Sequence, residues 1–116
     1  LSAYCGAVSA GAAAGAGIAY LDGGGYDEVI HTVVNALAIV SGMICDGAKA
    51  SCAGKIAAAI DAGILGYLMY RNGQQFYGGD GILSTTVEAT LVNVGRLGKV
   101  GMRSTDKEIL KIMLGQ

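Results

Sequence analysis

Apolar residues recur every three or four positions along most of this chain, which is the spacing of amphipathic helices. In segment 26–43 the recurring positions are Val29, Val33, Ala36, Val40 and Met43. In segment 51–71 they are Ile56, Ile60, Ile64 and Leu68. We find no alternating polar and apolar run of convincing length for a strand. The pattern therefore predicts an all-α fold in which these two stripes face the core.

Glycine clusters and capping signals divide the chain into about five helices. The predicted ranges are 2–20, 26–43, 51–71, 85–98 and 105–114. The triplet Gly23–Gly25 is a strong stop signal for the first helix. Thr85 with Glu88, and Thr105 with Glu108, match the capping-box pattern and predict the starts of the last two helices.

Small residues dominate the composition and predict unusually close helix packing. The chain has 116 residues, 20 of them glycine, and much of its 53% hydrophobic content is alanine. Small residues recur at a spacing of four at Gly6, Ala10 and Ala14, and again at Gly11 and Gly15. At this length one core is expected. We therefore expect a single compact helical bundle over residues 1–116.

The same small-residue pattern occurs in membrane helices, so a membrane protein is the alternative. Segment 1–21 carries no charge and is long enough to span a bilayer. Its alanine, glycine and serine content provides little transfer energy, however, and the later apolar run contains Lys55 and Asp61. Buried helices and no membrane span are the favoured interpretation, and without a signal peptide the expected location is the cytoplasm.

The charge pattern gives no support to nucleic-acid binding. The net charge is -1, the eight Lys and Arg residues form no block, and aromatic residues make up only 6% of the chain. A nucleic-acid interface would need a basic patch or stripe. No nucleic-acid partner is expected.

Three cysteines, Cys5, Cys45 and Cys52, are the residues with most chemical potential. They could be buried hydrophobic residues, and a disulfide is less favoured because nothing indicates an oxidising compartment. They could also be metal ligands, since Cys45 and Cys52 bracket a turn and a helix start, where the positive end of the helix dipole stabilises thiolates. A four-iron cluster with three protein thiolates would leave one iron open for catalysis.

Other polar residues carry weaker signals. Lys49 and Ser51 lie between two of the cysteines and could contact a substrate carboxylate or a cluster, but a solvated lysine and a helix N-cap serine are the favoured interpretation. His31 stands in an apolar helical run and is expected to be a core residue.

Three long segments resemble a known enzyme family. They are CGAVSAGAAAGAGIAYL from Cys5, SGMICDGAKASCAGKIA around Cys45 and Cys52, and STDKEILKIM near the end of the chain. Together they resemble the C-terminal portion of the L-cysteine desulfidase family, which is related to the α-domain of iron–sulfur L-serine dehydratases. The family's cluster ligands correspond to these three cysteines in order and spacing, and the spacing of the last two is closer to the desulfidases than to the dehydratases proper.

The resemblance implies a lyase that uses a [4Fe–4S] cluster and no pyridoxal phosphate. Such enzymes perform β-elimination on a small L-amino acid, which gives pyruvate and ammonia, with sulfide as a further product from L-cysteine. In the family the general base lies in the N-terminal part of the enzyme, so no catalytic residue is expected in this chain. We therefore expect a cluster-binding C-terminal domain that is inactive alone.

The partners implied are the amino-acid substrate and the N-terminal part of the same enzyme, and a homo-oligomer is a further option. The competing interpretation is a non-catalytic helical assembly domain with buried structural cysteines.

Overall fold

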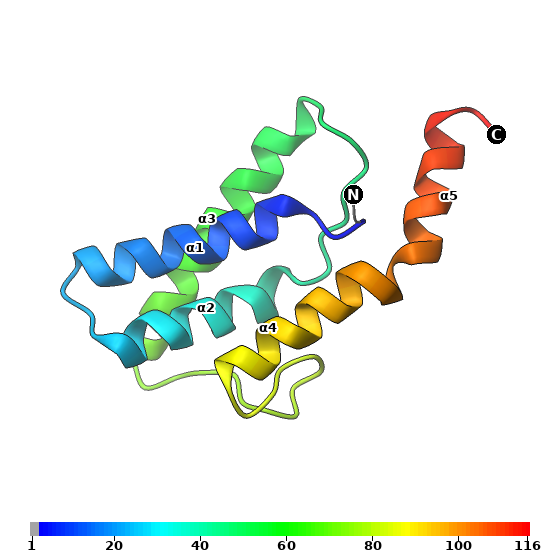
Figure 1. Cartoon of the computed structure of the whole chain (residues 1–116). Helices are drawn as coiled ribbons and strands as arrows, with labels where there is room; N and C mark the ends of the chain where they lie inside the picture. Colours follow the sequence, from blue (N-terminus) through cyan, green and yellow to red (C-terminus); the bar gives the residue numbers. More distant parts are fainter. Residues whose placement is uncertain (1–2) are drawn as a thin grey trace.

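Helices make up all the regular structure in the computed structural model, which describes residues 3–116. The elements are α1 (Gly6–Leu21), α2 (Tyr26–Val40), α3 (Ser51–Arg71), α4 (Val87–Arg96), the π-helical turn η1 (Leu97–Gly101) and α5 (Arg103–Met113) (Figure 1). The prediction of an all-α bundle of about five helices is confirmed. Among the described residues, β pairing is limited to an isolated bridge between Tyr4 and Ile44.

Glycine faces hold α1 and α3 together. A Cβ atom added to Gly15 would lie 2.6 Å from the Cα of Gly63, and one added to Gly63 would lie 2.5 Å from the carbonyl oxygen of Gly11. Such distances leave no room for any side chain, so the two backbones touch directly. The predicted close packing through small residues is therefore confirmed, and it produces the three-helix core of α1, α2 and α3.

The buried face of α3 differs from the predicted isoleucine stripe. Ile56 and Leu68 are both 47% exposed, and Ile64 is also exposed. The residues that α3 buries are Ala59, Ala62, Gly63, Gly66 and Tyr67. The prediction was wrong because the contact with α1 selects small side chains, which turns the large apolar ones outward.

Helix α2 buries a mixed face centred on a polar residue. Of the predicted stripe only Ala36 is fully buried, and Val29, Val33 and Val40 are half-buried. Asn35 is fully buried, donates from Nδ2 to the carbonyl oxygen of Gly66 at 3.0 Å and accepts from the backbone amide of Phe76 at 3.0 Å. This side chain ties α2 to α3 and to the loop that follows α3.

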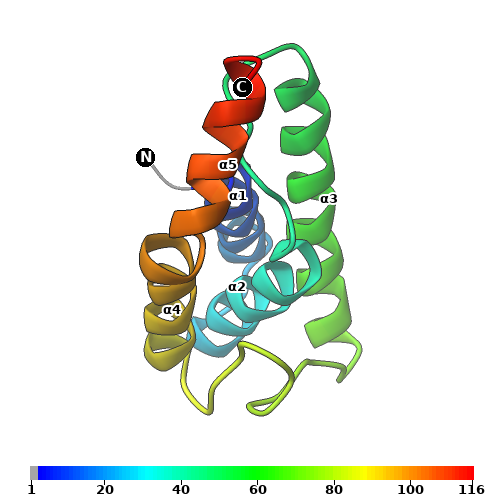
Figure 2. The same cartoon turned by 90° about the vertical axis from the view of Figure 1, so that its right-hand side faces the viewer.

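The remaining helices lie to one side of this core. Figure 2 shows α1 and α2 between α3 on one side and α4 with α5 on the other. Helix α4 packs on α2, and α5 contacts the rest of the bundle mainly through η1. Helix α5 has no buried residue.

The first two helices are shorter than predicted for a single reason. Residues 3–5 pair with residues 43–45: the Cys5 amide donates to the Met43 carbonyl at 3.1 Å, and the Cys45 amide donates to the Ala3 carbonyl at 2.6 Å. Because of this pairing, α1 begins only at Gly6, and α2 cannot extend to Met43. The predicted start at residue 2 itself lies outside the described residues.

Both predicted capping boxes were placed wrongly. Thr86, one residue after the predicted Thr85, caps α4 by accepting from the Ala89 amide at 3.1 Å. Thr105 lies inside α5, which begins at Arg103. At α4 the adjacent threonines offered two registers, whereas α5 follows η1 almost directly and begins after Met102 without a side-chain cap.

Helix α3 is long and apolar enough, by length and composition, to cross a membrane. The core helix of a water-soluble protein meets the same criterion. Its glycine face is occupied by α1, and Asp61 on the same helix is exposed.

The α1–α3 contact predicts opposite effects for two glycines of α1. Gly15→Ala should lower the free energy of unfolding by about 2 kcal/mol, because the added methyl group overlaps the backbone of α3. Gly17→Ala is the matched control: its Cβ meets nothing within 4 Å, so the better helix former should raise stability by roughly 0.5–1 kcal/mol. Urea unfolding of both variants measures the difference, and equal stabilities would disprove the close contact.

Candidate cysteine site

The connection between α2 and α3, residues 41–50, contacts all three cysteines. Cys45 lies on it, and Cys5 pairs with it through the Met43 carbonyl. Cys52, the second residue of α3, points its thiol at the Gly47 carbonyl with Sγ 3.5 Å from the oxygen. Cysteines 40 and 47 residues apart from Cys5 in the sequence are thus brought to one loop.

The three thiols differ in burial. Cys5 is only 6% exposed and belongs to the core cluster of α1 and α2. Cys45 packs against the edge of that cluster and is half-buried, as is Cys52. All three are free thiols. The site therefore runs from the core of the bundle outward to the start of α3.

Lys55 fixes the connection to α3. Its ammonium group donates to the Ile44 carbonyl at 2.8 Å and to Asp46 Oδ1 at 2.7 Å, the residues on either side of Cys45. The hydrogen bond to Asp46 raises the pKa of Lys55, burial opposes this, and the charges of Asp46, Cys5 and Cys52 raise the pKa further. A cation thus lies within electrostatic reach of two of the thiols. Sequence reasoning noted Lys55 only as an obstacle to a membrane span, although it lies one helical turn after Cys52.

Asp46 links the two lysines of this region. Hydrogen bonds from Lys49 and then Lys55 lower the pKa of Asp46 to about 2. The carboxylate therefore stays ionised at any physiological pH, and both ion pairs persist there.

The two weaker candidates sit on the exposed side of the connection. The Lys49 side chain is 48% exposed and is engaged by Asp46, and Ser51 is exposed. Ser51 is the first residue of α3 and not its N-cap. That position belongs to Ala50, which has helical backbone angles and no capping side chain, so the N-cap interpretation was wrong. The role of Lys49 and Ser51 in substrate binding stays a prediction.

The three cysteines at the connection can be compared with the ligands that metals and iron–sulfur clusters use in proteins. Over residues 3–116, no three His, Cys, Asp or Glu side chains are placed to hold a single metal ion. An iron–sulfur cluster is larger than a single metal ion, and its usual ligands are cysteine thiolates. Cys5, Cys45 and Cys52 provide donors of this type. In chemical type the residues fit such a cluster.

A pocket of about 530 Å³ opens beside Cys5. One wall comes from the start of α1 and the other from the end of α4 and η1, which supplies Gly98 and Lys99. Short π-helical segments within helices occur frequently at functional sites. Besides these residues, the lining consists of Tyr4, Cys5, Gly6, Ser9, Val94 and Gly95. The pocket offers a small ligand the Lys99 cation and the Ser9 hydroxyl, close to the buried Cys5.

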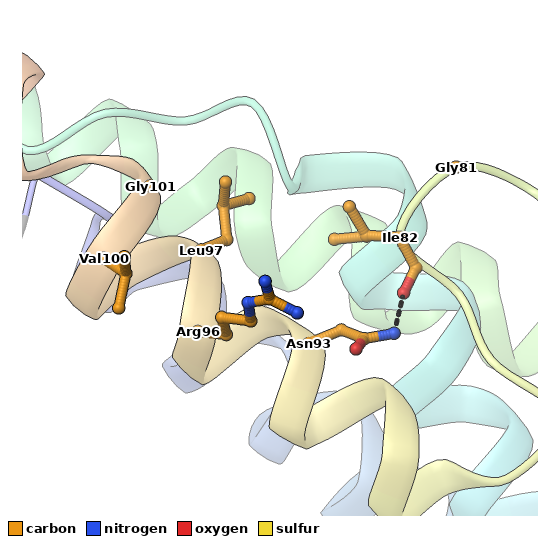
Figure 3. A pocket seen from close by; sticks show the side chains of 7 residues that line it. All are labelled: Gly81, Ile82, Asn93, Arg96, Leu97, Val100 and Gly101. Carbon is orange, nitrogen blue, oxygen red and sulfur yellow. Dashed lines mark hydrogen bonds between the residues drawn. The ribbon is translucent and has the colours of Figure 1, made fainter.

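A second pocket of about 430 Å³ lies where α4 and η1 face the loop at Gly81 (Figure 3). Asn93 closes one side by donating from Nδ2 to the Ile82 carbonyl at 2.9 Å, and Arg96 lies beside it. Its other lining residues are mostly apolar, and no predicted site residue reaches it. The pocket beside Cys5 is therefore the better candidate for a site.

The sequence matches the family described as serine dehydratase alpha chain over residues 1–111. It is 71% identical over its whole length to a UPF0597 protein of Desulfitobacterium hafniense. It is also 54% identical over 98% of the chain to a UPF0597 protein of Lachnoclostridium phytofermentans, and 52% identical over 98% to one of Finegoldia magna. The chain spans 27% of the length of each of these relatives. No solved structure matches it.

The difference in burial predicts an order of thiol reactivity. In the folded chain iodoacetamide should alkylate Cys45 and Cys52 faster than Cys5, because the Cys5 thiol is enclosed by core side chains. Mass spectrometry of peptides after timed quenching gives the three rates. Unfolding in guanidinium is the control and should bring the rates together; equal rates in the folded chain would contradict the burial of Cys5.

Proposed function

The chain belongs to the serine dehydratase alpha chain family, and from this premise we propose that it is the cluster-binding domain of a [4Fe–4S]-dependent lyase. The lyase performs β-elimination on a small L-amino acid without pyridoxal phosphate. One observation carries the proposal: three free cysteines far apart in the sequence contact the same short connection, 41–50.

Cys5, Cys45 and Cys52 are the proposed cluster ligands. A cluster bound by three protein thiolates supplies Lewis-acid chemistry toward the leaving thiol or hydroxyl group. The cationic Lys55 offsets part of the negative charge that three thiolates would bring to this region. Free thiols and such a cluster both require a reducing compartment, which supports the cytoplasm as the location.

The pocket beside Cys5 is the proposed place for the amino-acid substrate. The ammonium group of Lys99 is a suitable partner for the substrate carboxylate, and the Ser9 hydroxyl can hydrogen-bond to it. Lys49 is less suitable because Asp46 already engages it. A general base for α-proton abstraction is assigned to the part of the full-length protein outside this chain, as the family resemblance implies.

L-Cysteine is the proposed substrate and L-serine the alternative. The choice rests on the spacing of Cys45 and Cys52, which resembles the desulfidase branch of the family. The two amino acids differ only in the leaving atom, and a thiol is the softer ligand for iron.

A non-catalytic assembly domain is the second candidate function. The observation that favours it is the outward face of α3, where Leu65 and Leu68 are each about half exposed. Exposed apolar patches of this kind mark contacts with other protein surfaces. A second copy of the chain or the remainder of a longer protein could cover this face. Such a contact is compatible with a cluster bound by the three cysteines.

Cluster binding can be tested on the chain itself. After anaerobic reconstitution with iron and sulfide, the chain should show broad absorbance near 400 nm and bind about four irons. Cys5→Ala, Cys45→Ala and Cys52→Ala should each lose most of this absorbance. Thermal unfolding of each apo variant is the control for misfolding. A folded variant that retains the full cluster signal would remove that cysteine from the ligand set.

The reaction can be tested on a full-length protein that contains this chain. With the reconstituted cluster, L-cysteine should give pyruvate, ammonia and sulfide in equal amounts, and L-serine should give pyruvate and ammonia more slowly. The chain alone should bind the cluster without producing pyruvate. Cluster binding without elimination in the full-length protein would contradict the proposed lyase reaction.

A further inference from the structure

We propose that Lys55 is a positioning residue that holds Cys45 in place relative to Cys52 and thereby retains the cluster. The role of the lysine rests on the proposed function, whereas its effect on the connection can be measured without any cluster.

Lys55 lies on the same helix as Cys52 and binds the two residues on either side of Cys45. Its side chain extends from α3 one turn after Cys52, and its ammonium group binds the Ile44 carbonyl at 2.8 Å and Asp46 at 2.7 Å. Cys45 is the residue between these two partners. The lysine therefore links Cys45 to the helix that carries Cys52.

Two features make this link effective. The Lys55 side chain is only 21% exposed, so water competes for its ammonium group less than at an open surface. One of its partners is a main-chain carbonyl, which fixes the backbone of the connection itself. Lys49 shares the Asp46 carboxylate, but its side chain is 48% exposed and it pairs with a side chain and not with the main chain of the connection.

The other polar contacts near Cys45 hold the connection to the N-terminal segment and not to α3. The pairing with residues 3–5 anchors Met43 and Cys45 to the N-terminal segment, and the thiol of Cys52 contacts Gly47 through a long, weak hydrogen bond. Gly47 has a φ of +95° and Ala48–Ala50 are exposed. Main-chain hydrogen bonds join residues 49 and 50 to the start of α3, and Lys55 provides the side-chain link from α3 to residues 44–46.

The first test uses hydrogen–deuterium exchange of the chain without a cluster to measure how firmly the connection is held. Lys55→Met keeps the length of the side chain and its helix propensity but removes the donors. Exchange in residues 43–50 should accelerate about tenfold, the loss expected for a hydrogen bond to a charged group. Lys55→Arg should restore slow exchange. Lys111→Met is the control, because it removes an exposed ion pair on α5 and should leave this segment unchanged. Unchanged exchange in Lys55→Met would overturn the proposal.

The second test follows the cluster after anaerobic reconstitution. Lys55→Met should lose the visible absorbance of the cluster about tenfold faster than the unsubstituted chain in the presence of a chelator, and Lys55→Arg should retain it. Equal loss rates would overturn the role of Lys55 in cluster retention. If the unsubstituted chain binds no cluster, the proposed function fails, and the exchange experiment still decides whether Lys55 holds the connection.

Discussion

Direct backbone contact between α1 and α3 is the constraint on which the rest of this structure depends. At Gly11, Gly15 and Gly63 the two helices approach so closely that a single methyl group would overlap the opposite main chain. A contact of this kind allows very little sliding or rotation, because each glycine must stay opposite its partner. It therefore sets where the first turn of α3 lies relative to the start of α1, and these two places carry Cys52 and Cys5.

The same contact determines which residues of α3 remain outside. A helix that turns its smallest residues inward must turn its larger apolar residues outward, and Ile56, Ile64, Leu65 and Leu68 are all exposed. The core of the isolated chain is accordingly built mostly from small side chains. The largest fully buried ones are Val8, Asn35, Thr32 and Thr90, which provide less hydrophobic stabilisation than leucine or phenylalanine would. The polar members offset this through hydrogen bonds: Asn35 joins three segments, and Thr90 accepts from the Ser84 amide at 3.0 Å.

Helix content was predictable from the sequence, but helix orientation was not. Periodicity located all five helices because it depends on local spacing, and the range of α3 was correct at both ends. The same reasoning chose the wrong face of α3, since it ranks residues by hydrophobicity whereas the contact with α1 selects by size. The predicted helix ends were wrong where long-range pairing changes the local structure, as at residues 3–5. They were also wrong where two adjacent threonines could each cap the helix, as at Thr85 and Thr86.

The candidate site shows a similar division between local and long-range information. The three cysteines were found through the resemblance of whole segments, and spacing alone left them ambiguous. Lys55 was missed because its partners, a main-chain carbonyl and Asp46, become apparent only when the connection folds back along α3. Its distance of three residues from Cys52 was a usable signal, since positions i and i+3 share one face of a helix.

The position of α5 adds a last physical argument about this site. The helix has no buried residue, yet Ile109, Ile112 and Met113 line a pocket of about 290 Å³ whose other side is the connection at Ile44, Asp46 and Lys49. The Cε methyl group of Met113 lies 3.0 Å from the position that a Cβ atom at residue 47 would occupy. Glycine at position 47 therefore satisfies two demands, a positive φ and room for Met113. Through this contact the last helix reaches the same connection that the three cysteines share, so both ends of the described chain meet at the candidate site.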